Sequence, residues 1–310
     1  MIYTCTVSPS IDYTNYLPAF KTGALNRSEK VNYYPGGKGI NVSRVLKRLG
    51  VDSIAYGFAG GFTGQFIQDF LAAEDVRTDF IDTGQISRIN IKIKAGEETE
   101  LNGPGPELSN SHLQELKKKV ENIKPGDWFV LSGSIPDTLP IDYFISLGET
   151  LQKQKARFVL DTSGKALSEL IDSRPFLIKP NIEELGELFQ TTIQNKEHAA
   201  ECAFQLTAKG VANVIVSMGA DGAMLVDREQ AYFAEAPTGQ MVNTVGAGDS
   251  LVSGFIASLS KGSSKEEAFR YGIASGSATA FSNDLCRKEE TETLLDQIKV
   301  RPFKRLDVKK

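Results

Sequence analysis

Residues 35–60, PGGKGINVSRVLKRLGVDSIAYGFAG, combine a glycine-rich turn, a helix-like pattern and a strand-like run in immediate succession. In the middle of this stretch the apolar residues recur at the spacing of one helix face. These residues are Ile40, Val42, Val45, Leu46 and Leu49. The run that follows, SIAYGFAG, is short and apolar, as is typical of a buried strand. The stretch therefore predicts a helix that leads directly into a strand.

The same alternation of strand-like and helix-like segments continues along the chain. Further strand-like runs are IYTCTVS, DWFVLSGS, ARFVLDTS, FLIKPN and VANVIVSMG. Most of them are separated by segments with helical spacing, which indicates βαβ units. We therefore predict an α/β fold with a mostly parallel sheet and helices on both faces. In such folds ligands bind beyond the carboxyl ends of the strands, and several runs here end in small or polar residues.

Two segments interrupt the alternation. Residues 11–35 contain strand-like pieces without a helix, and residues 86–103 alternate polar and apolar side chains with a period of two, as in a half-exposed antiparallel hairpin. Both could pair into a small sheet beside the main one, or they could form edge strands of the main sheet. We expect residues 1–310 to form a single domain that carries this small sheet.

Composition limits the classes of partner. The 310 residues are 41% hydrophobic and 24% charged, which is ordinary for a globular protein. The net charge is −4, so no global positive field is present to bind a nucleic acid. We expect no nucleic-acid partner, and any anionic ligand must be bound locally.

The cysteines and the N-terminal segment point to one compartment. Cys5, Cys202 and Cys286 are far apart and lack metal-ligand spacing, which is typical of reduced thiols. The first residues are strand-like rather than a signal sequence, and no run approaches the roughly 18 apolar residues of a membrane span. We therefore expect a cytoplasmic protein without a membrane segment.

The segment VNTVGAGDS places small residues directly before a helix-like pattern. Gly246, Ala247 and Gly248 should lie at a helix N-terminus, where backbone N–H groups lack partners and the helix dipole favours an anion. Asp249 and Ser250 follow them. Two interpretations fit this segment: an anion site with a functional aspartate, or an ordinary well-capped helix.

Two more segments allow a functional and a structural interpretation. PGGKGIN opens a helix with Lys38 and Asn41, which could contact an anionic or hydroxylated ligand, although such a lysine can equally be a surface residue. KPNIEEL brings Asn181 and Glu184 together after a strand. An amide oxygen and a carboxylate suit Mg²⁺ held through water, but the same pair also fits a helix capping box.

Three further places could contribute to binding. In VIVSMGADGA, residues 214–223, a strand leads through a tight turn into another strand, where a nucleotide could lie against the backbone or the turn could be a plain hairpin. Asp12 could accept two sugar hydroxyls, and Arg88 matches a phosphate in a bidentate manner. Each of these two charges, taken alone, also fits a surface residue.

The order of these motifs resembles the ribokinase-like family of sugar kinases and, within it, the phosphofructokinase B group. The resemblance covers essentially the whole chain. It rests on PSID, PGGKGINVSRVLKRLG, GGFTG, SRINIK, ETELNGPGP, LSGSIP, KPNIEEL, VSMGADGA and VNTVGAGDS. It implies the ribokinase-like fold, in which the small sheet formed by residues 11–35 and 86–103 is a lid that often also joins two subunits. A homodimer through this lid is therefore expected.

The resemblance also implies roles for individual residues. Asp249 matches the catalytic base, beside an anion hole for the transferring phosphoryl group made by Gly246, Ala247 and Gly248. Residues that resemble the ATP site are Lys179, Ser217, Gly219 and Gly222, and those that match the magnesium element are Asn181 and Glu184. Residues that resemble the sugar side are Asp12, Gly37, Lys38, Asn41 and Arg88, the last as a contact to the substrate phosphate. Ser8 departs from the family, which usually has asparagine there.

The implied activity is the ATP- and Mg²⁺-dependent phosphorylation of D-fructose 1-phosphate to fructose 1,6-bisphosphate. Tagatose 6-phosphate is the alternative acceptor, and a sugar-phosphate sensor without catalysis is an alternative on the same scaffold. A dinucleotide-dependent oxidoreductase is disfavoured because Leu251 stands where its fingerprint requires glycine.

Overall fold

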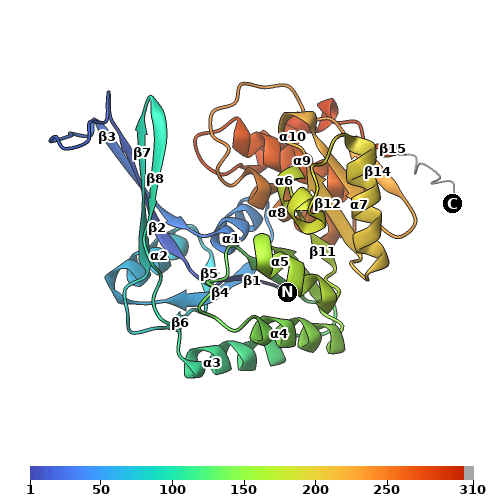
Figure 1. Cartoon of the computed structure of the whole chain (residues 1–310), viewed down its shortest axis with the longest axis horizontal. Coiled ribbons are helices and arrows are strands. Elements are labelled where there is room, and N and C mark those ends of the chain that lie inside the picture. Colours follow the sequence, from blue (N-terminus) through green and yellow to red (C-terminus); the bar gives the residue numbers. More distant parts are fainter. Residues whose placement is uncertain (304–310) are drawn as a thin grey trace.

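The computed structural model describes residues 1–303, and its largest element is a mostly parallel sheet (Figure 1). Strands β5, β4, β1, β9, β10, β11 and β12 are parallel, and β13, β14 and β15 extend the sheet in antiparallel fashion. Their bounds are β1 Ile2–Thr6, β4 Ser53–Ala59, β5 Arg77–Thr78, β9 Trp128–Ser132, β10 Arg157–Asp161, β11 Leu177–Ile178, β12 Asn213–Ser217, β13 Ala223–Val226, β14 Ala231–Ala234 and β15 Arg301–Phe303. A further short strand, β6 Ile81–Asp82, pairs with β4. The predicted α/β class is confirmed.

Helices cover both faces of this sheet, as predicted. One face carries α3 Asn110–Glu121, α4 Ile141–Lys153, α5 Gly164–Leu170, α6 Ile182–Phe189 and α7 Lys196–Ala208. The other carries α1 Lys38–Arg48, α8 Ala247–Ser260, α9 Lys265–Ala280 and α10 Lys288–Leu294. Helix α2, Gly61–Ala73, packs through Ile67 and Leu71 onto Ile40 of α1.

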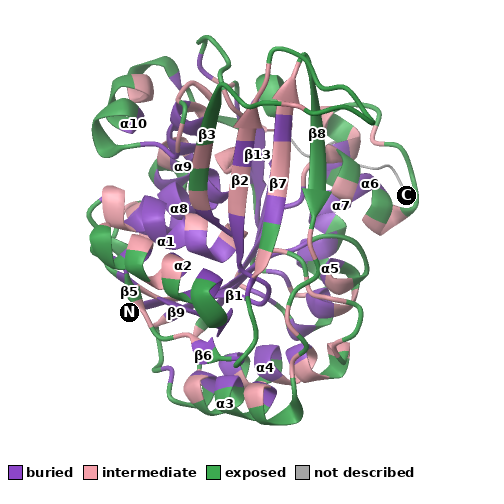
Figure 2. Ribbon diagram, turned by 90° about the vertical axis from the view of Figure 1, so that its left-hand side faces the viewer, coloured by how far each residue is buried: buried purple, intermediate pink, exposed green. Residues whose placement is uncertain are grey.

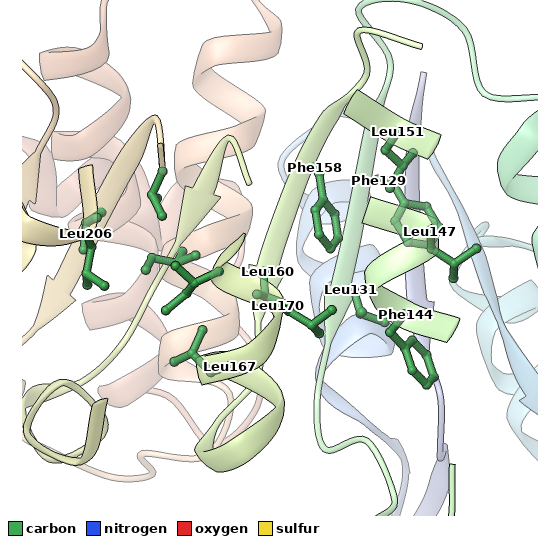
Figure 3. Close-up of a cluster of buried hydrophobic side chains, with 14 of the residues drawn as sticks. Phe129, Leu131, Phe144, Leu147, Leu151, Phe158, Leu160, Leu167, Leu170 and Leu206 are labelled. Carbon is green, nitrogen blue, oxygen red and sulfur yellow. The ribbon is translucent and has the colours of Figure 1, made fainter. Parts of the chain in front are cut away.

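The core follows from strand alternation. Phe129 and Leu131 of β9 point to the face with α4, where they meet Phe144 and Leu147 (Figure 3). The residues between them, Trp128 and Val130, belong to the cluster on the opposite face. Every residue of β9 is buried, so the sheet is sandwiched between two apolar layers.

A second, four-stranded sheet stands beside the main one (Figures 1 and 2). It contains β2 Ser10–Tyr16, β3 Lys30–Gly36, β7 Arg88–Ala95 and β8 Glu97–Asn102 in the order β3-β2-β7-β8. The period-two segment forms the predicted antiparallel hairpin of β7 and β8. These segments are therefore not edge strands of the main sheet, although β2 and β7 pair in parallel.

The carboxyl ends of the parallel strands lie at one edge of the main sheet, where polar turns lead into the helices. Asp161 ends β10 and Ser132 ends β9, and both are buried. The small sheet, α1 and the start of α8 approach this same edge, which locates the candidate site. Within residues 1–303, no helix is both long enough and apolar enough to span a membrane.

Candidate active site

The start of α8 has the predicted backbone geometry. Gly246 precedes the helix with φ 81°, and a Cβ there would lie 2.5 Å from Cδ2 of Leu285, so glycine is required on two counts. The N–H of Ala247 donates to the carbonyl of Thr244 at 3.2 Å. Among the described residues the N–H groups of Gly246 and Gly248 have no partner. Two donors therefore remain available for an anion.

Asp249 lies in the first turn of α8 and is 5% exposed. Nδ2 of Asn41, from α1, donates a hydrogen bond of 2.8 Å to its Oδ2. Burial, reinforced by the charge of Asp161, raises the pKa of Asp249 to about 6, although Lys38, Asn41 and Lys179 oppose the rise. A carboxylate with this pKa is a better proton acceptor than an ordinary aspartate.

Two lysines approach the same buried carboxylate. Nζ of Lys38 lies 3.7 Å from Oδ1 of Asp161, and Nζ of Lys179 lies 3.4 Å from it. Asp161 is 2% exposed. Although burial pushes the pKa of Asp161 upward, Lys179 and Lys38 hold it below its usual range. The charge of Asp161 in turn raises the pKa of Lys38 against the effect of burial, so Lys38 remains cationic.

On the opposite wall, Asp12 is fixed by its neighbours. Ser10 Oγ donates to its Oδ1 at 2.8 Å, and Nδ2 of Asn90 donates to the same oxygen at 3.1 Å. Oδ2 lies 3.8 Å from Nζ of Lys92, which leaves it accessible to a hydroxyl group. The buried Ser8 also lines the site. The orientation of Asp12 thus comes from Ser10 and Asn90 rather than from position 8.

Arg88 begins β7 beside Asp12. Burial lowers the pKa of its guanidinium, and Asp12 only partly offsets the effect. Its Nε is buried and has no hydrogen-bond partner among the described residues. Because buried polar atoms in native proteins are nearly always paired, this donor is available to an oxygen-rich ligand. A phosphate group fits this guanidinium in charge and geometry.

These residues surround one cavity of about 510 Å³. The predicted residues that line it are Asp12, Gly37, Lys38, Asn41, Arg88, Lys179, Gly246, Gly248 and Asp249. Residues from the two interrupting segments and from both glycine-rich turns thus meet in one place. The volume suits a small ligand of the size of a sugar phosphate.

Ala247, the first residue of α8, does not line this cavity. The other predicted residues outside the lining lie just beyond neighbouring strand ends. Asn181 and Glu184 form a complete capping box: Oδ1 of Asn181 accepts from Glu184 N at 2.7 Å, and Oε2 of Glu184 accepts from Asn181 N at 2.9 Å. Ser217 ends β12 next to Asn181, while Gly219 and Gly222 form the turn into β13. KPNIEEL therefore forms the helix capping box, and VIVSMGADGA forms the turn between two strands, that the sequence allowed.

The capping box leaves the chemistry of a metal contact intact. Oε1 of Glu184 takes no part in the capping bonds, and the charge of Glu184 acts on Lys38. An amide oxygen and a carboxylate remain a donor set that Mg²⁺ accepts through water. No group of three or more His, Cys, Asp or Glu side chains that could hold a metal ion occurs within the described part of the chain.

Several site residues were not singled out from the sequence. Asn90 and Lys92 share a face of β7 with Arg88, so the period-two pattern already contained them. Asp161 closes the run ARFVLD at a strand end, which was a usable signal. Glu100 and Asn102 line the cavity from β8, and only the hairpin register brings them there.

Comparison with known proteins agrees with this geometry. The model of the pfkB family of carbohydrate kinases matches residues 6–292. The 1-phosphofructokinase of Bacillus subtilis (strain 168) is 49% identical over 300 residues, covering 97% of this chain and 99% of that protein. The D-tagatose-1-phosphate kinase of Bacillus licheniformis is 38% identical over 301 residues, covering 97% and 99%. The solved tetrameric inhibited form of phosphofructokinase-2 from Escherichia coli superimposes with a TM-score of 0.89 at 32% identity, covering 95% of this chain and 98% of that one.

Proposed function

Because the chain belongs to the pfkB family of carbohydrate kinases, we propose that it phosphorylates D-fructose 1-phosphate with ATP. The products are fructose 1,6-bisphosphate and ADP. The observation that carries the proposal is the buried Asp249, hydrogen-bonded to Asn41 at the N-terminus of α8 and facing the same cavity as Arg88. A proton acceptor, unpaired N–H groups and a phosphate-binding cation share one site.

The reaction follows from these groups. The 6-hydroxyl oxygen of the sugar attacks the γ-phosphorus, its proton passes to Asp249, and the bond from phosphorus to the ADP oxygen breaks. The raised pKa of about 6 makes Asp249 an effective acceptor that is still mostly ionised at neutral pH. The hydrogen bond from Asn41 fixes its orientation.

Charge on the transferring phosphoryl group is stabilised by fixed donors. The free N–H groups of Gly246 and Gly248 and the dipole of α8 would stabilise the negative charge of this group. They are already in place, so the protein would not have to rearrange during the reaction. Lys38 and Lys179 add two cations beside them. Phosphoryl transfer relies on such positioning and neutralisation more than on covalent catalysis.

The ATP side is assigned to the strand ends beyond Lys179. Ser217, Gly219 and Gly222 would contact the nucleotide along the turn after β12. Asn181 and Glu184 would hold Mg²⁺ through water, and the ion supplies further neutralisation of the phosphates when bound. Mutation of Glu184 should accordingly raise the Mg²⁺ concentration needed for half-maximal activity.

The sugar side is assigned to the small sheet and α1. Arg88 would bind the existing phosphate of the substrate, and Asp12 would accept hydroxyl groups through Oδ2, the oxygen that Ser10 and Asn90 do not use. Gly37, Lys38 and Asn41 complete this wall. The small sheet of a single-domain enzyme would then act as a lid that excludes water during transfer.

We also propose that the outer face of the small sheet joins two copies of the chain. Register places apolar side chains on the face opposite Asp12, including Val31, Tyr33, Ile89 and Leu101, all of which are exposed (Figure 2). Patches of this kind mark interfaces. Light scattering should give a dimer mass for the wild type and a monomer mass for Leu101→Lys, whereas Phe62→Lys, an exposed apolar residue on α2, should stay dimeric.

The three buried free cysteines suit a reducing compartment. We therefore propose the cytoplasm as the location of this ATP-dependent activity.

An ADP-release assay over a panel of acceptors tests the proposed function. The panel comprises fructose 1-phosphate, tagatose 1-phosphate, fructose 6-phosphate, tagatose 6-phosphate and fructose. Fructose 1-phosphate should have the highest kcat/KM, and phosphorus NMR should identify fructose 1,6-bisphosphate. Tagatose 1-phosphate is the second candidate, because the Bacillus licheniformis relative is a kinase for that sugar. A preference for either 6-phosphate would reject the assignment.

A further inference from the structure

Asp161 has an unusual environment for a buried carboxylate. It ends β10 at the edge of the main sheet, and its side chain is 1% exposed. Neither carboxylate oxygen has a hydrogen-bond partner among the described residues. Its neighbours are two ammonium groups, both measured to the same oxygen, at 3.4 Å for Lys179 and 3.7 Å for Lys38. A buried anion without hydrogen bonds is costly, and this arrangement therefore calls for an explanation.

The two lysines come from opposite sides of the site. Lys38 is the first residue of α1, on the sugar side, and Lys179 follows β11, on the nucleotide side. Lys179 also lies against the start of α8, since a Cβ on Gly248 would be 3.1 Å from its Nζ. Both ammonium groups line the cavity that contains Asp249. The two cations thus converge beside the unpaired N–H groups.

Two cations this close repel each other, and one carboxylate between them removes that repulsion. The separations of 3.4 and 3.7 Å are longer than hydrogen bonds. Contacts this long occupy the ammonium groups only weakly, so each lysine keeps donors for another acceptor. The charge of Asp161 thus holds the two lysines in place and leaves N–H donors of both for a ligand.

We infer that Asp161 is a positioning residue, which holds Lys38 and Lys179 on the two sides of the transferring phosphoryl group. The inference rests on the proposed kinase function. The carboxylate does not touch the reacting atoms; it acts through the lysines. Glu184 and Asp249 are the other charged groups that act on this set.

Loss of this positioning should lower kcat without weakening ATP binding, whereas misfolding would reduce both. Asp161→Asn keeps the shape of the side chain and removes its charge, so the lysines lose their common anchor and repel each other. Removal of a negative charge beside the phosphates leaves the ground-state affinity for ATP unchanged or tighter. The aligned transition-state contacts are lost, and kcat should fall about tenfold to a hundredfold.

The experiment combines calorimetry and kinetics on the full chain. A non-hydrolysable ATP analogue is titrated without sugar, and kcat and both KM values are measured with the preferred acceptor of the wild type. Asp227→Asn is the matched control, because this buried aspartate pairs with Lys265 at 2.7 Å on the turn between β13 and β14 and does not line the cavity. That control should keep the wild-type kcat.

The expected result is a lower kcat with an analogue Kd that is equal or tighter. Adding Asp161→Asn to a Lys38→Met/Lys179→Met background should cost no further activity, because the carboxylate acts only through those lysines. A kcat within twofold of wild type, a Kd weakened in parallel with kcat, or an additive loss in that background would overturn the inference. Wild-type turnover reports separately on the proposed function, since the calorimetric measurement needs neither sugar nor transfer.

Discussion

The amide of Asn41 donates a hydrogen bond of 2.8 Å to the carboxylate of Asp249, joining residues 208 positions apart in the chain. Asn41 lies in the first turn of α1, and Asp249 in the first turn of α8. The two helices also meet at Ser253, whose Oγ lies 3.4 Å from the carbonyl oxygen of Val42. The orientation of the proposed proton acceptor is thus set by α1, the helix that we assign to the sugar side of the site.

The pH dependence of catalysis should report on Asp249. Since burial raises its pKa to about 6 and the base must be ionised, kcat/KM should be constant near neutral pH. It should fall as the pH decreases through about 6, with one proton taken up. A profile measured from about pH 5 to 8 checks this. A midpoint near the ordinary aspartate value of about 4 would contradict the assigned environment.

Loss of the Asn41 hydrogen bond should move this midpoint upward. The bond favours the charged form of Asp249, so Asn41→Ala should raise the pKa of Asp249 further and lower kcat. The same pH profile provides the measurement. Asn122→Ala, an exposed amide at the end of α3, serves as the control and should leave the midpoint in place. An unchanged midpoint in Asn41→Ala would show that the bond does not tune the base.

Arg88→Ala should affect the sugar and spare the nucleotide. Loss of a charge-assisted contact to the substrate phosphate should raise the KM for fructose 1-phosphate at least about tenfold, with the KM for ATP nearly unchanged. Lys94→Ala is a matched control on the same face of β7, outside the main cavity. Steady-state kinetics for both substrates checks the split, and a parallel rise in both KM values would argue against a phosphate contact.

Arg44 should be a stability residue rather than a site residue. It is 2% exposed and pairs with Glu74 at 2.6 Å and Asp284 at 3.1 Å, linking α1, α2 and the segment after α9. Arg44→Met removes the hydrogen bonds of the buried guanidinium and leaves the half-buried Glu74 and Asp284 with Arg48 as their partner. It should cost about 2 kcal/mol in the free energy of unfolding. Urea denaturation measures the loss. Lys47 lies on the same helix as Arg44 and forms an exposed ion pair with Asp52. Lys47→Met should change the free energy of unfolding by less than about 1 kcal/mol.

Local patterns predicted most of the architecture. Period-two alternation in residues 86–103 identified the hairpin of β7 and β8, and helical spacing after residue 38 identified α1. These predictions hold because the apolar residues that make up each pattern are the residues that become buried on folding. The small residues at the start of α8 likewise indicated unpaired N–H groups, which are a local property of a helix start, while an anion bound there remains a proposal.

Long-range contacts were not predictable from such patterns. The parallel pairing of β2 with β7 and the addition of β15 to β14 depend on which strands meet in space. Asp161 was part of a strand end, but its two lysine partners lie on other elements. The sequence likewise left Asn181 and Glu184 open between a cap and a metal contact. The structure shows the cap, and the metal contact remains a proposal.

The replacement Asp249→Asn tests whether Asp249 accepts the proton of the sugar hydroxyl, because it keeps the side-chain shape and removes the basic carboxylate. The measurement is the steady-state rate of ADP release with saturating ATP and fructose 1-phosphate, on protein whose circular dichroism and ATP-analogue affinity match the wild type. If Asp249 accepts the proton, kcat should fall by about a thousandfold. A folded, ATP-binding Asp249→Asn variant that turns over within tenfold of the wild type would contradict it.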